Sequence, residues 1–442
     1  MSDWYNLQAD LDFPLPGDIA PAGDARRRLR VSIPPSLLRQ ERGRERWHPI
    51  PPEVADAYAA WRPTPLRRAA TFERAIGTRS RIWFKYEGGN VSGSHKFNTA
   101  VAQAHYYAGA GVTELVVGTG AGQWGTAVAA ACARLGLRCT VFMVRSSRRS
   151  KPYRGALMRL LGTDVVESPS DRTPVGRKAL AEDPEHGGTL SIALGEAQEF
   201  AQEYGGSFCT GSGEGYSLLH QTVIGLESLA QLRELGVAPD VVTACVGGGS
   251  NFGGLTFPFL GAGLRGELEV TPRLVAAEST ACPTLTRGRY AYDFTDASRG
   301  TALQKMYTLG ADYAVPPMHA GGLRYHGSAK LISALLDRGA IEARAHRQRD
   351  VFESAALFLR TEGILPAPES AHALHSARRE ALELDRAGGG TVLTCVSGHG
   401  LLDLAGYEGY LNGDLADVDV DDEIARSLAL LPEVPTPSGR AR

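Results

Sequence analysis

A histidine and a lysine lie side by side in the stretch SGSHKFNTA, residues 92–100, after a Gly-Ser turn and before a run of small apolar residues. A lysine is most often a solvated surface charge, so Lys96 on its own predicts no chemistry. A lysine that does chemistry needs neighbours that bind a cofactor or a substrate. Three loops elsewhere in the chain are candidates for that role.

The loop GGGSN, residues 247–251, is the strongest candidate for binding a phosphate. Three consecutive glycines let the backbone approach closely and direct several N–H groups at one point. Ser250 and Asn251 add side-chain donors for a phosphate monoester. No Gly-Lys-Ser/Thr follows, so the loop is not a nucleotide P-loop, and a flexible turn is the alternative interpretation.

A second loop, GTGAGQWG at residues 118–125, has G-x-G-x-x-G spacing after an expected strand and before an expected helix. This spacing is typical of a dinucleotide-binding turn, which also needs an acidic residue about 20 positions later. The chain has arginines there, in MVRSSRR, so only an NADP version of that interpretation remains. The same geometry also forms an anion site, where turn and helix N–H groups bind a carboxylate.

The third loop, SGHG at residues 397–400, places the hydroxyl of Ser397 at the end of a strand, where it can face a ring nitrogen. Alone, this loop is typical of a plain strand-to-helix turn. Together with Lys96, the phosphate loop and the carboxylate loop, it completes the groups needed to hold pyridoxal phosphate and an amino acid.

Short β-rich runs alternate with longer helical runs along the chain, for example ELVVG (114–118) before TAVAAACARLG. This alternation predicts an α/β fold with mostly parallel sheets covered by helices. The three loops follow strands at their C-terminal ends, where ligands bind in open α/β sheets. We expect the first sixty residues to form an arm packed on the body and residues 431–442 to form a loose tail.

Composition excludes several other classes of function. The net charge of -2 supplies no basic field for nucleic acid, and no basic amphipathic segment indicates a membrane surface. No apolar run approaches the roughly 20 residues of a membrane span and the N-terminus has no signal-peptide pattern, so we expect a cytoplasmic protein.

The six cysteines do not have the spacing of a zinc site, so we expect them to be reduced residues of the core. His372 and His375 lie three residues apart without an apparent third ligand, so we predict no metal site.

Several motifs occur in order over most of the chain: GSHKFNTA, GTGAGQWG, KPYRGALM, LLHQTVIGLE, CVGGGSNFGGL, HAGGLRYHG, RTEGILPAPESAHA and SGHGLLDL. With these motifs the chain resembles the β-subunit family of tryptophan synthase, and more closely its longer second type, within the fold-type II pyridoxal-phosphate enzymes. The resemblance implies two doubly wound three-layer domains with mostly parallel sheets. The smaller domain would span residues 95–220 and include a mobile communication-type region. The larger domain would bind the cofactor and comprise residues 61–94 and 221–430. Residues 1–60 would form the arm.

The resemblance also implies roles for individual residues. Lys96 would form the Schiff base and move protons, and Ser397 would leave the pyridine nitrogen unprotonated, which suits loss of a β-substituent through an aminoacrylate. Asp312 would help to close the site around the substrate hydroxyl. The implied cofactor ligands are His95, Lys96, Asn98, Gly247, Gly248, Gly249, Ser250, Asn251, Glu369 and Ser397, and the implied ligands of the substrate carboxylate are Thr119, Gly120, Ala121, Gly122 and Gln123.

The family resemblance further suggests a homodimer, argues against a tightly bound α-subunit partner, and allows a monovalent cation as a second cofactor. The partners expected are therefore small molecules, namely an amino-acid substrate and a nucleophile.

The chain departs from the family in the turn before the lysine, EGGNVSGSHK, where the family has a proline, and at two further places. The family has a glutamate before Thr-Gly-Ala-Gly-Gln that acts as acid and base, and this chain has Gly118. Loss of a positioned general acid–base typically costs on the order of 10²- to 10⁴-fold in rate. The second of these two places is GSGEGYS (211–217), where the longer type reads approximately Gly-Ser-Val-Leu-Asn-His-Val. This segment should border the pocket for the nucleophile, and its Glu214 is a candidate replacement acid–base, with a surface loop as the equal alternative.

We therefore predict a pyridoxal-phosphate-dependent β-replacement on serine or a relative such as O-phosphoserine. An altered nucleophile would give a tryptophan-like or other non-proteinogenic amino acid. The alternatives are tryptophan synthase β-chain activity proper, serine or threonine β-elimination, and a catalytically weak homologue that serves as a binding or regulatory protein. An NADP oxidoreductase comes last.

Overall fold

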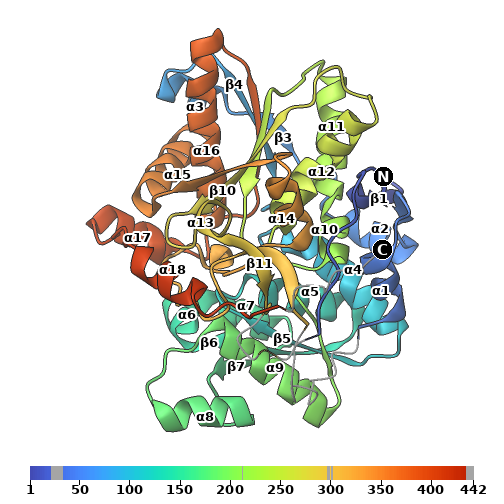
Figure 1. Ribbon diagram of the computed structural model, residues 1–442, viewed down its shortest axis with the longest axis vertical. Helices are drawn as coiled ribbons and strands as arrows, with labels where there is room; N and C mark the ends of the chain where they lie inside the picture. The colour runs from blue at the N-terminus through green and yellow to red at the C-terminus, as the bar shows by residue number, and fades with distance from the viewer. Residues whose placement is uncertain (21–32, 212, 296–298, 300–301, 435–442) are drawn as a thin grey trace, which may run out of the picture.

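The computed structural model describes residues 1–20, 33–211, 213–295, 299 and 302–434. Its body contains two sheets of mostly parallel strands, with helices on the faces of each (Figure 1). The expected α/β fold with mostly parallel sheets is confirmed. The larger sheet has the strand order β13-β10-β9-β14-β4-β3, in which β3 alone is antiparallel to its neighbour. Its strands are β3 (Leu66–Arg68), β4 (Arg81–Tyr86), β9 (Val241–Cys245), β10 (Arg273–Ser279), β13 (Glu342–His346) and β14 (Thr391–Val396).

Apolar residues make the strands of the larger sheet suitable for burial on both faces. All five residues of β9 are buried, as expected for a central strand of a parallel sheet. Helix α16 packs against β9 and β14, and α12 packs against β9. The helices of this half are α3 (Ala70–Ile76), α11 (Val223–Glu234), α12 (Ser250–Leu264), α13 (Thr284–Arg287), α14 (Lys330–Asp337), α15 (Gln348–Glu362), α16 (Pro368–Leu384), α17 (Leu404–Asn412) and α18 (Asp421–Leu428).

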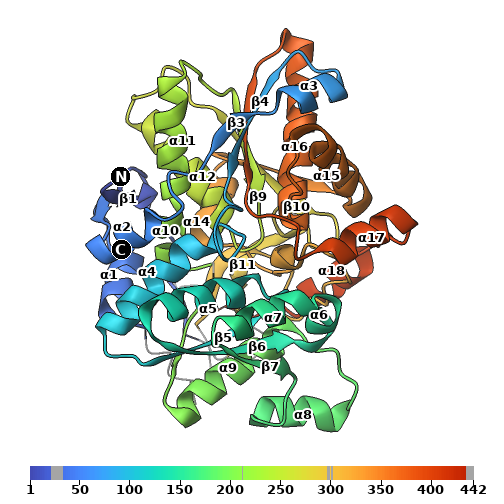
Figure 2. The same ribbon diagram turned by 180° about the vertical axis from the view of Figure 1, so that it is seen from behind.

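The smaller sheet has the order β7-β6-β5-β8 and is entirely parallel. Figures 1 and 2 show α9 on one face of this sheet and α5 with α7 on the other. Both α5 and α9 pack against β5 and β6. The elements are β5 (Glu114–Thr119), β6 (Arg138–Val144), β7 (Asp164–Ser168), β8 (Ser207–Phe208), α4 (Lys96–Gly109), α5 (Gln123–Leu135), α6 (Arg145–Ser150), α7 (Pro152–Leu160), α8 (Pro174–Glu182), α9 (Leu190–Tyr204) and α10 (Gly215–Gln221).

The N-terminal segment lies against α4 and α10, where the buried ring of Trp4 contacts the ring of His220. A separate hairpin is formed by β11 and β12. The expected tail falls mostly on residues 435–442, which lie outside the described residues. The remaining elements are β1 (Asp3–Tyr5), β2 (Trp47–Pro49), α1 (Pro35–Arg42), α2 (Pro52–Tyr58), β11 (Arg289–Asp293), β12 (Gln304–Thr308) and the 3-10 turns η1 (Leu7–Ala9), η2 (Gly321–Leu323) and η3 (Asp385–Ala387).

All six cysteines are buried with free thiols, as expected for reduced core residues. None of the described helices combines the length and apolar character needed to cross a membrane. Within the same residues, no group of three or more histidine, cysteine or acidic side chains is arranged to hold a metal ion.

Three histidines of the larger half form a cluster in the core. The ring of His346, at the end of β13, lies 4.9 Å from that of His375 on α16. Burial, with smaller contributions from the other two histidines, lowers the pKa of His346 from 6.5 to about 2. Burial also lowers the pKa of His372 to about 4. These side chains are therefore neutral in the folded protein at pH values where an exposed histidine is charged.

This cluster predicts acid sensitivity of the fold. Below pH 6.5 the unfolded chain takes up protons at these histidines, whereas folded His372 stays neutral down to about pH 4. The free energy of unfolding should therefore fall as pH decreases from 6.5, by up to about 1.4 kcal/mol per pH unit for each buried histidine. Chemical denaturation across this pH range measures the slope. A shallower slope is expected for His346→Gln, and an unchanged slope would contradict the assignment.

Candidate active site

A cavity lies where loops of the larger sheet meet the first turns of α4, α5 and α12. These segments are far apart in sequence but come together because the C-terminal ends of parallel strands share one edge of a sheet. The cavity is lined by Ser94, His95, Lys96, Gln123, Cys245, Gly247, Gly248, Gly249, Ser250, Asn251, Gly322, Leu323, Ala367, Glu369, Ser397 and Gly398.

Lys96 is the first residue of α4, and its side chain reaches the cavity. Its Nζ donates to Oε1 of Gln123 at 3.3 Å. Burial lowers the pKa of the Lys96 amine, although the nearby Glu369 carboxylate partly restores it. A lysine with a lowered pKa supplies a neutral amine, which is the form that attacks a carbonyl carbon.

His95 connects two of the loops predicted from the sequence. Its Nδ1 lies 3.3 Å from the carbonyl oxygen of Ser397, and its Nε2 lies 3.3 Å from Oγ of Ser250. Burial, with a smaller contribution from the charge of Lys96, lowers the pKa of His95 to about 3. His95 is therefore a neutral, fixed link between the phosphate loop and the end of β14.

The glycine loop after β9 has the backbone geometry of an anion site. The N–H groups of Gly247, Gly248 and Gly249 have no acceptor within the described residues, and the loop leads directly into the N-terminus of α12. Gly249 has a left-handed φ of 115°. A Cβ on Gly247 would lie 2.2 Å from the carbonyl oxygen of Gly322. The loop thus fits a phosphate, and its shape requires glycine at positions 247 and 249.

Polar contacts join the rest of the cavity wall. Nε2 of Gln123 donates to Oε2 of Glu369 at 2.9 Å, and the Gly322 N–H donates to Oε1 of the same carboxylate at 2.7 Å. The Ser397 hydroxyl lies 2.8 Å from that of Ser370. Ser397 therefore offers a neutral hydroxyl at the wall, which is compatible with a pyridine nitrogen.

The structure brings only part of the expected carboxylate loop to the cavity. Gln123 lines it, whereas Thr119, Gly120, Ala121 and Gly122 precede it on the turn between β5 and α5 without lining the cavity. This turn packs against the loop at residues 320–324, where a Cβ on Gly321 would lie 2.3 Å from that of Ala121. Their role in binding the substrate carboxylate stays a prediction.

Three other predicted residues do not line the cavity. Asn98 is fully buried and its amide faces the side chains of Arg62 and Glu87. Asp312 forms an ion pair with Arg299 at 2.6 Å. Their expected roles at the substrate are not tested by this geometry.

Glu214 precedes α10 and also lies outside the cavity wall. Burial raises the pKa of Glu214 to about 7, and the neighbouring Glu41 carboxylate contributes to this rise. Its Oε2 has no hydrogen-bond partner within the described part of the chain. A carboxyl group with this pKa exchanges protons readily near neutral pH.

Reasoning from the sequence missed Arg324, which follows the cavity residues Gly322 and Leu323. Burial lowers the pKa of its guanidinium, and its Nε has no partner among the described residues. Its Nη2 donates to the carbonyl oxygen of Met318. The motif HAGGLRYHG contains this arginine, but sequence alone does not show that the chain buries it beside the cavity.

The backbone of α9 fills the space beside Gly118. A Cβ on Gly118 would lie 2.6 Å from the carbonyl oxygen of Ala193 and 2.7 Å from the N atom of Leu194. Both contacts are with backbone atoms, which cannot rotate away as a side chain can. Position 118 therefore accommodates no side chain unless α9 moves.

The comparisons with known proteins agree with this fold and cavity, which define a fold-type II pyridoxal-phosphate enzyme. Residues 58–398 match the family described as pyridoxal-phosphate dependent enzymes. The chain is 49% identical over 423 residues to tryptophan synthase beta chain 2 of Thermococcus kodakarensis, covering 94% of this chain and 95% of the relative. It is also 49% identical over 429 residues to the protein of that name from Aeropyrum pernix, covering 95% of each. The chain therefore belongs to the tryptophan synthase β-chain family of pyridoxal-phosphate dependent enzymes.

More distant solved structures share the fold. Maize serine racemase has a TM-score of 0.57 at 16% identity, covering 82% of this chain and 98% of its own. The L-serine ammonia-lyase of Rhizomucor miehei has a TM-score of 0.58 at 16% identity, covering 80% of this chain and 98% of its own. The expected fold type is thus confirmed, and the family match confirms the expected cofactor.

The phosphate loop provides a direct test of the cofactor site. Gly247→Ala should weaken binding of pyridoxal phosphate by about tenfold or more, because the added methyl group collides with the backbone at Gly322. Titration of the cofactor-free protein, followed by fluorescence, measures the dissociation constant. Gly109→Ala is the matched control, since its Cβ would meet no atom within 4 Å. Equal affinities of the two variants would refute the loop's role.

Proposed function

We propose that this enzyme catalyses β-replacement on an amino acid whose β-substituent leaves as a stable anion, with O-phosphoserine as the donor class. The contact between Gly118 and the backbone of α9 carries this proposal. The family resemblance assigns the proton transfers at the leaving group and the nucleophile to a glutamate at this position. In this chain those two tasks must be divided between other groups.

The residues around the cavity support the retained half of the chemistry. Bound pyridoxal phosphate supplies an electron sink for breaking bonds at the α- and β-carbons of an amino acid. The N–H groups of residues 247–249 and the Ser250 hydroxyl would bind its phosphate, and the Ser397 hydroxyl would be the partner of its ring nitrogen. The Lys96 amine would hold the cofactor and move the proton at the substrate α-carbon.

The leaving group is the first task of the missing glutamate. A serine hydroxyl must be protonated to leave, whereas phosphate leaves as an anion without a general acid. Arg324 follows cavity residues 322 and 323 in the chain, and its Nε has no hydrogen-bond partner in the described part of the chain. Arginine binds phosphate through paired N–H donors, so Arg324 is suited to stabilise this leaving group.

The proton of the nucleophile is the second task. Glu214 belongs to the segment 211–217 that differs from the family pattern, and its pKa of about 7 suits a group that accepts a proton. We infer that this segment borders the incoming nucleophile and that Glu214 deprotonates it. The nucleophile then differs from indole in shape or acidity, and the product is a tryptophan-like or other non-proteinogenic amino acid.

The experiment that tests the donor combines serine and O-phosphoserine with indoles, thiols and amines, and identifies products by mass spectrometry. We expect O-phosphoserine to be used in preference to serine. Arg324→Gln should reduce kcat/KM for O-phosphoserine by about 10²-fold while changing that for serine little, because a charge-assisted contact to the phosphate is lost. Preference for serine, with indole as the best nucleophile, would instead identify ordinary tryptophan synthesis. Pyruvate without a coupled product would identify β-elimination.

Glu214 gives a separate prediction for the coupling step. Glu214→Gln should slow coupling by about 10²-fold and remove a kinetic inflection near pH 7, while phosphate release from the donor continues. Glu41→Gln is the companion variant. Because the Glu41 carboxylate raises the pKa of Glu214, its removal should move the inflection to lower pH. Wild-type coupling rates and pH profiles in both variants would exclude Glu214 from proton transfer.

A further inference from the structure

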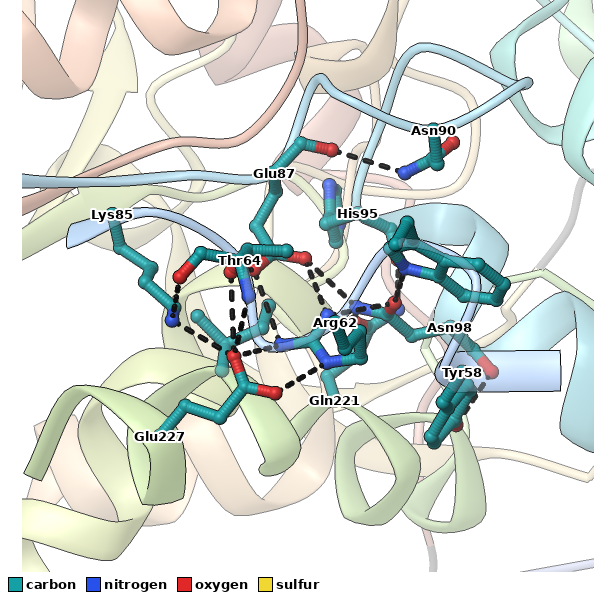
Figure 3. Close-up of polar contacts among 12 residues, drawn as sticks. Tyr58, Arg62, Thr64, Lys85, Glu87, Asn90, His95, Asn98, Gln221 and Glu227 are labelled. Atoms are coloured by element: carbon teal, nitrogen blue, oxygen red, sulfur yellow. Dashed lines mark hydrogen bonds and ion pairs between the residues drawn. The ribbon is translucent and has the colours of Figure 1, made fainter. Parts of the chain in front are cut away.

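Four buried charged side chains form a cluster behind the cavity (Figure 3). Arg62 donates through Nη1 to Oε2 of Glu87 at 2.8 Å and through Nε to Oε1 of Glu227 at 2.8 Å. A second bond from Nη2 reaches each carboxylate, so Arg62 contacts both in a bidentate manner. Lys85 donates to Oε2 of Glu227 at 2.8 Å. Two positive and two negative groups are therefore held together away from water.

Such a cluster is not explained by stability alone. Burying charges is costly, and replacing a buried ion pair by apolar residues is often neutral or stabilising. Burial by itself would raise the pKa of Glu87, but Arg62 brings it down to about 2, so Glu87 stays ionised. The best-supported use of buried polar groups is to specify one arrangement of the surrounding elements.

The element that this cluster specifies is the first turn of α4. Asn98 uses its amide fully: Oδ1 accepts from Arg62 Nη1 at 3.0 Å, and Nδ2 donates to Glu87 at 3.1 Å and to Gln221 at 3.0 Å. Gln221 in turn donates through Nε2 to the carbonyl oxygen of His95 at 3.0 Å. The cluster is thus bonded to the residue before Lys96 and to the residue two positions after it, as Figure 3 shows.

This turn has particular need of such support. His95 occupies the N-cap position of α4 but makes no side-chain capping bond. Its imidazole is used instead between the phosphate loop and Ser397. A lysine side chain is long and flexible, and its amine makes one contact, of 3.3 Å, to Gln123. The direction of the backbone at residues 95–98 therefore decides where the amine lies.

We propose that Arg62, Glu87, Asn98 and Gln221 are positioning residues that fix the Lys96 amine in the cavity without touching cofactor or substrate. The proposal rests on the proposed role of Lys96 as the residue that binds the cofactor. It differs from the role implied by the family resemblance, in which Asn98 is itself a cofactor ligand. The Asn98 amide has all its bonds on the side of Arg62, Trp61, Glu87 and Gln221.

An isosteric charge swap tests this network. Asn98→Asp replaces the donor that faces Glu87 by a carboxylate oxygen, so repulsion should tilt the first turn of α4. The double variant Glu87→Gln with Asn98→Asp keeps every side-chain length and returns a donor and an acceptor to the 87–98 pair, while Arg62 Nη1 loses the Oε2 acceptor of Glu87. We expect Asn98→Asp to slow the reaction of Lys96 with pyridoxal phosphate by about tenfold or more, and the double variant to restore part of the rate.

Gln231→Glu is the matched control, because Gln231 accepts from Lys85 at 2.8 Å at the other end of the cluster. This variant adds a carboxylate to the same cluster, and residue 231 makes none of the hydrogen bonds that join the cluster to α4. Borohydride trapping with peptide mass spectrometry measures cofactor on Lys96, and acetylation of Lys96 in the cofactor-free protein measures amine reactivity independently. Thermal unfolding confirms that each variant is folded.

The outcomes separate the positioning role from the proposed function. A slower Lys96 reaction in Asn98→Asp, partial recovery in the double variant and a wild-type rate in Gln231→Glu support the network. Equal trapping and acetylation rates in all folded variants would overturn it. Failure of the wild-type protein to carry cofactor on Lys96 would overturn the proposed function, and the acetylation rates would still decide on the network.

Discussion

The close approach of α9 to Gly118 is the constraint on which the proposed chemistry depends. A glycine in a strand usually leaves space, but here the carbonyl of Ala193 occupies it. Proton transfer from this position is therefore excluded by packing as well as by residue type. The cavity retains a nucleophilic amine and a phosphate loop but lacks this proton carrier. The proposed chemistry therefore requires a donor and a nucleophile that react without proton transfer at position 118.

The cavity wall holds few ionisable side chains besides Lys96 and Glu369 within the described residues. His95 is neutral, and the amine of Lys96 is made easier to deprotonate by burial. Compensated ion pairs lie behind the wall instead. One of them joins the two halves of the protein, because Asp403, which follows β14, accepts from Lys151 and Arg154 at 2.6 Å each.

The sequence predicts much of the fold and the centre of the site because both follow local rules. Strands ending in glycine loops indicate a parallel sheet, and their shared edge brings residues 247–251 and Ser397 toward Lys96. The sequence also indicates that Asn98 points away from the cavity, because residues two apart on a helix point in nearly opposite directions. Lys96 and Asn98 therefore cannot both face the cavity from the first turn of α4.

Other features depend on contacts between segments distant in sequence and have no local signal. Neither the burial of Arg324 nor the packing of α9 against Gly118 follows from residue type or spacing, because each requires the loops to be placed first. The charged cluster around Arg62 is another example, since its members come from a loop, a strand end and α11.

An electron-density map of the wild-type protein crystallised with pyridoxal phosphate and inorganic phosphate tests the central claim most directly. The account predicts cofactor joined to Lys96, the Ala193 carbonyl in van der Waals contact with Gly118, and a second phosphate bound by Arg324. A map in which α9 is withdrawn and a carboxylate or an ordered water occupies the space beside Gly118 would contradict it.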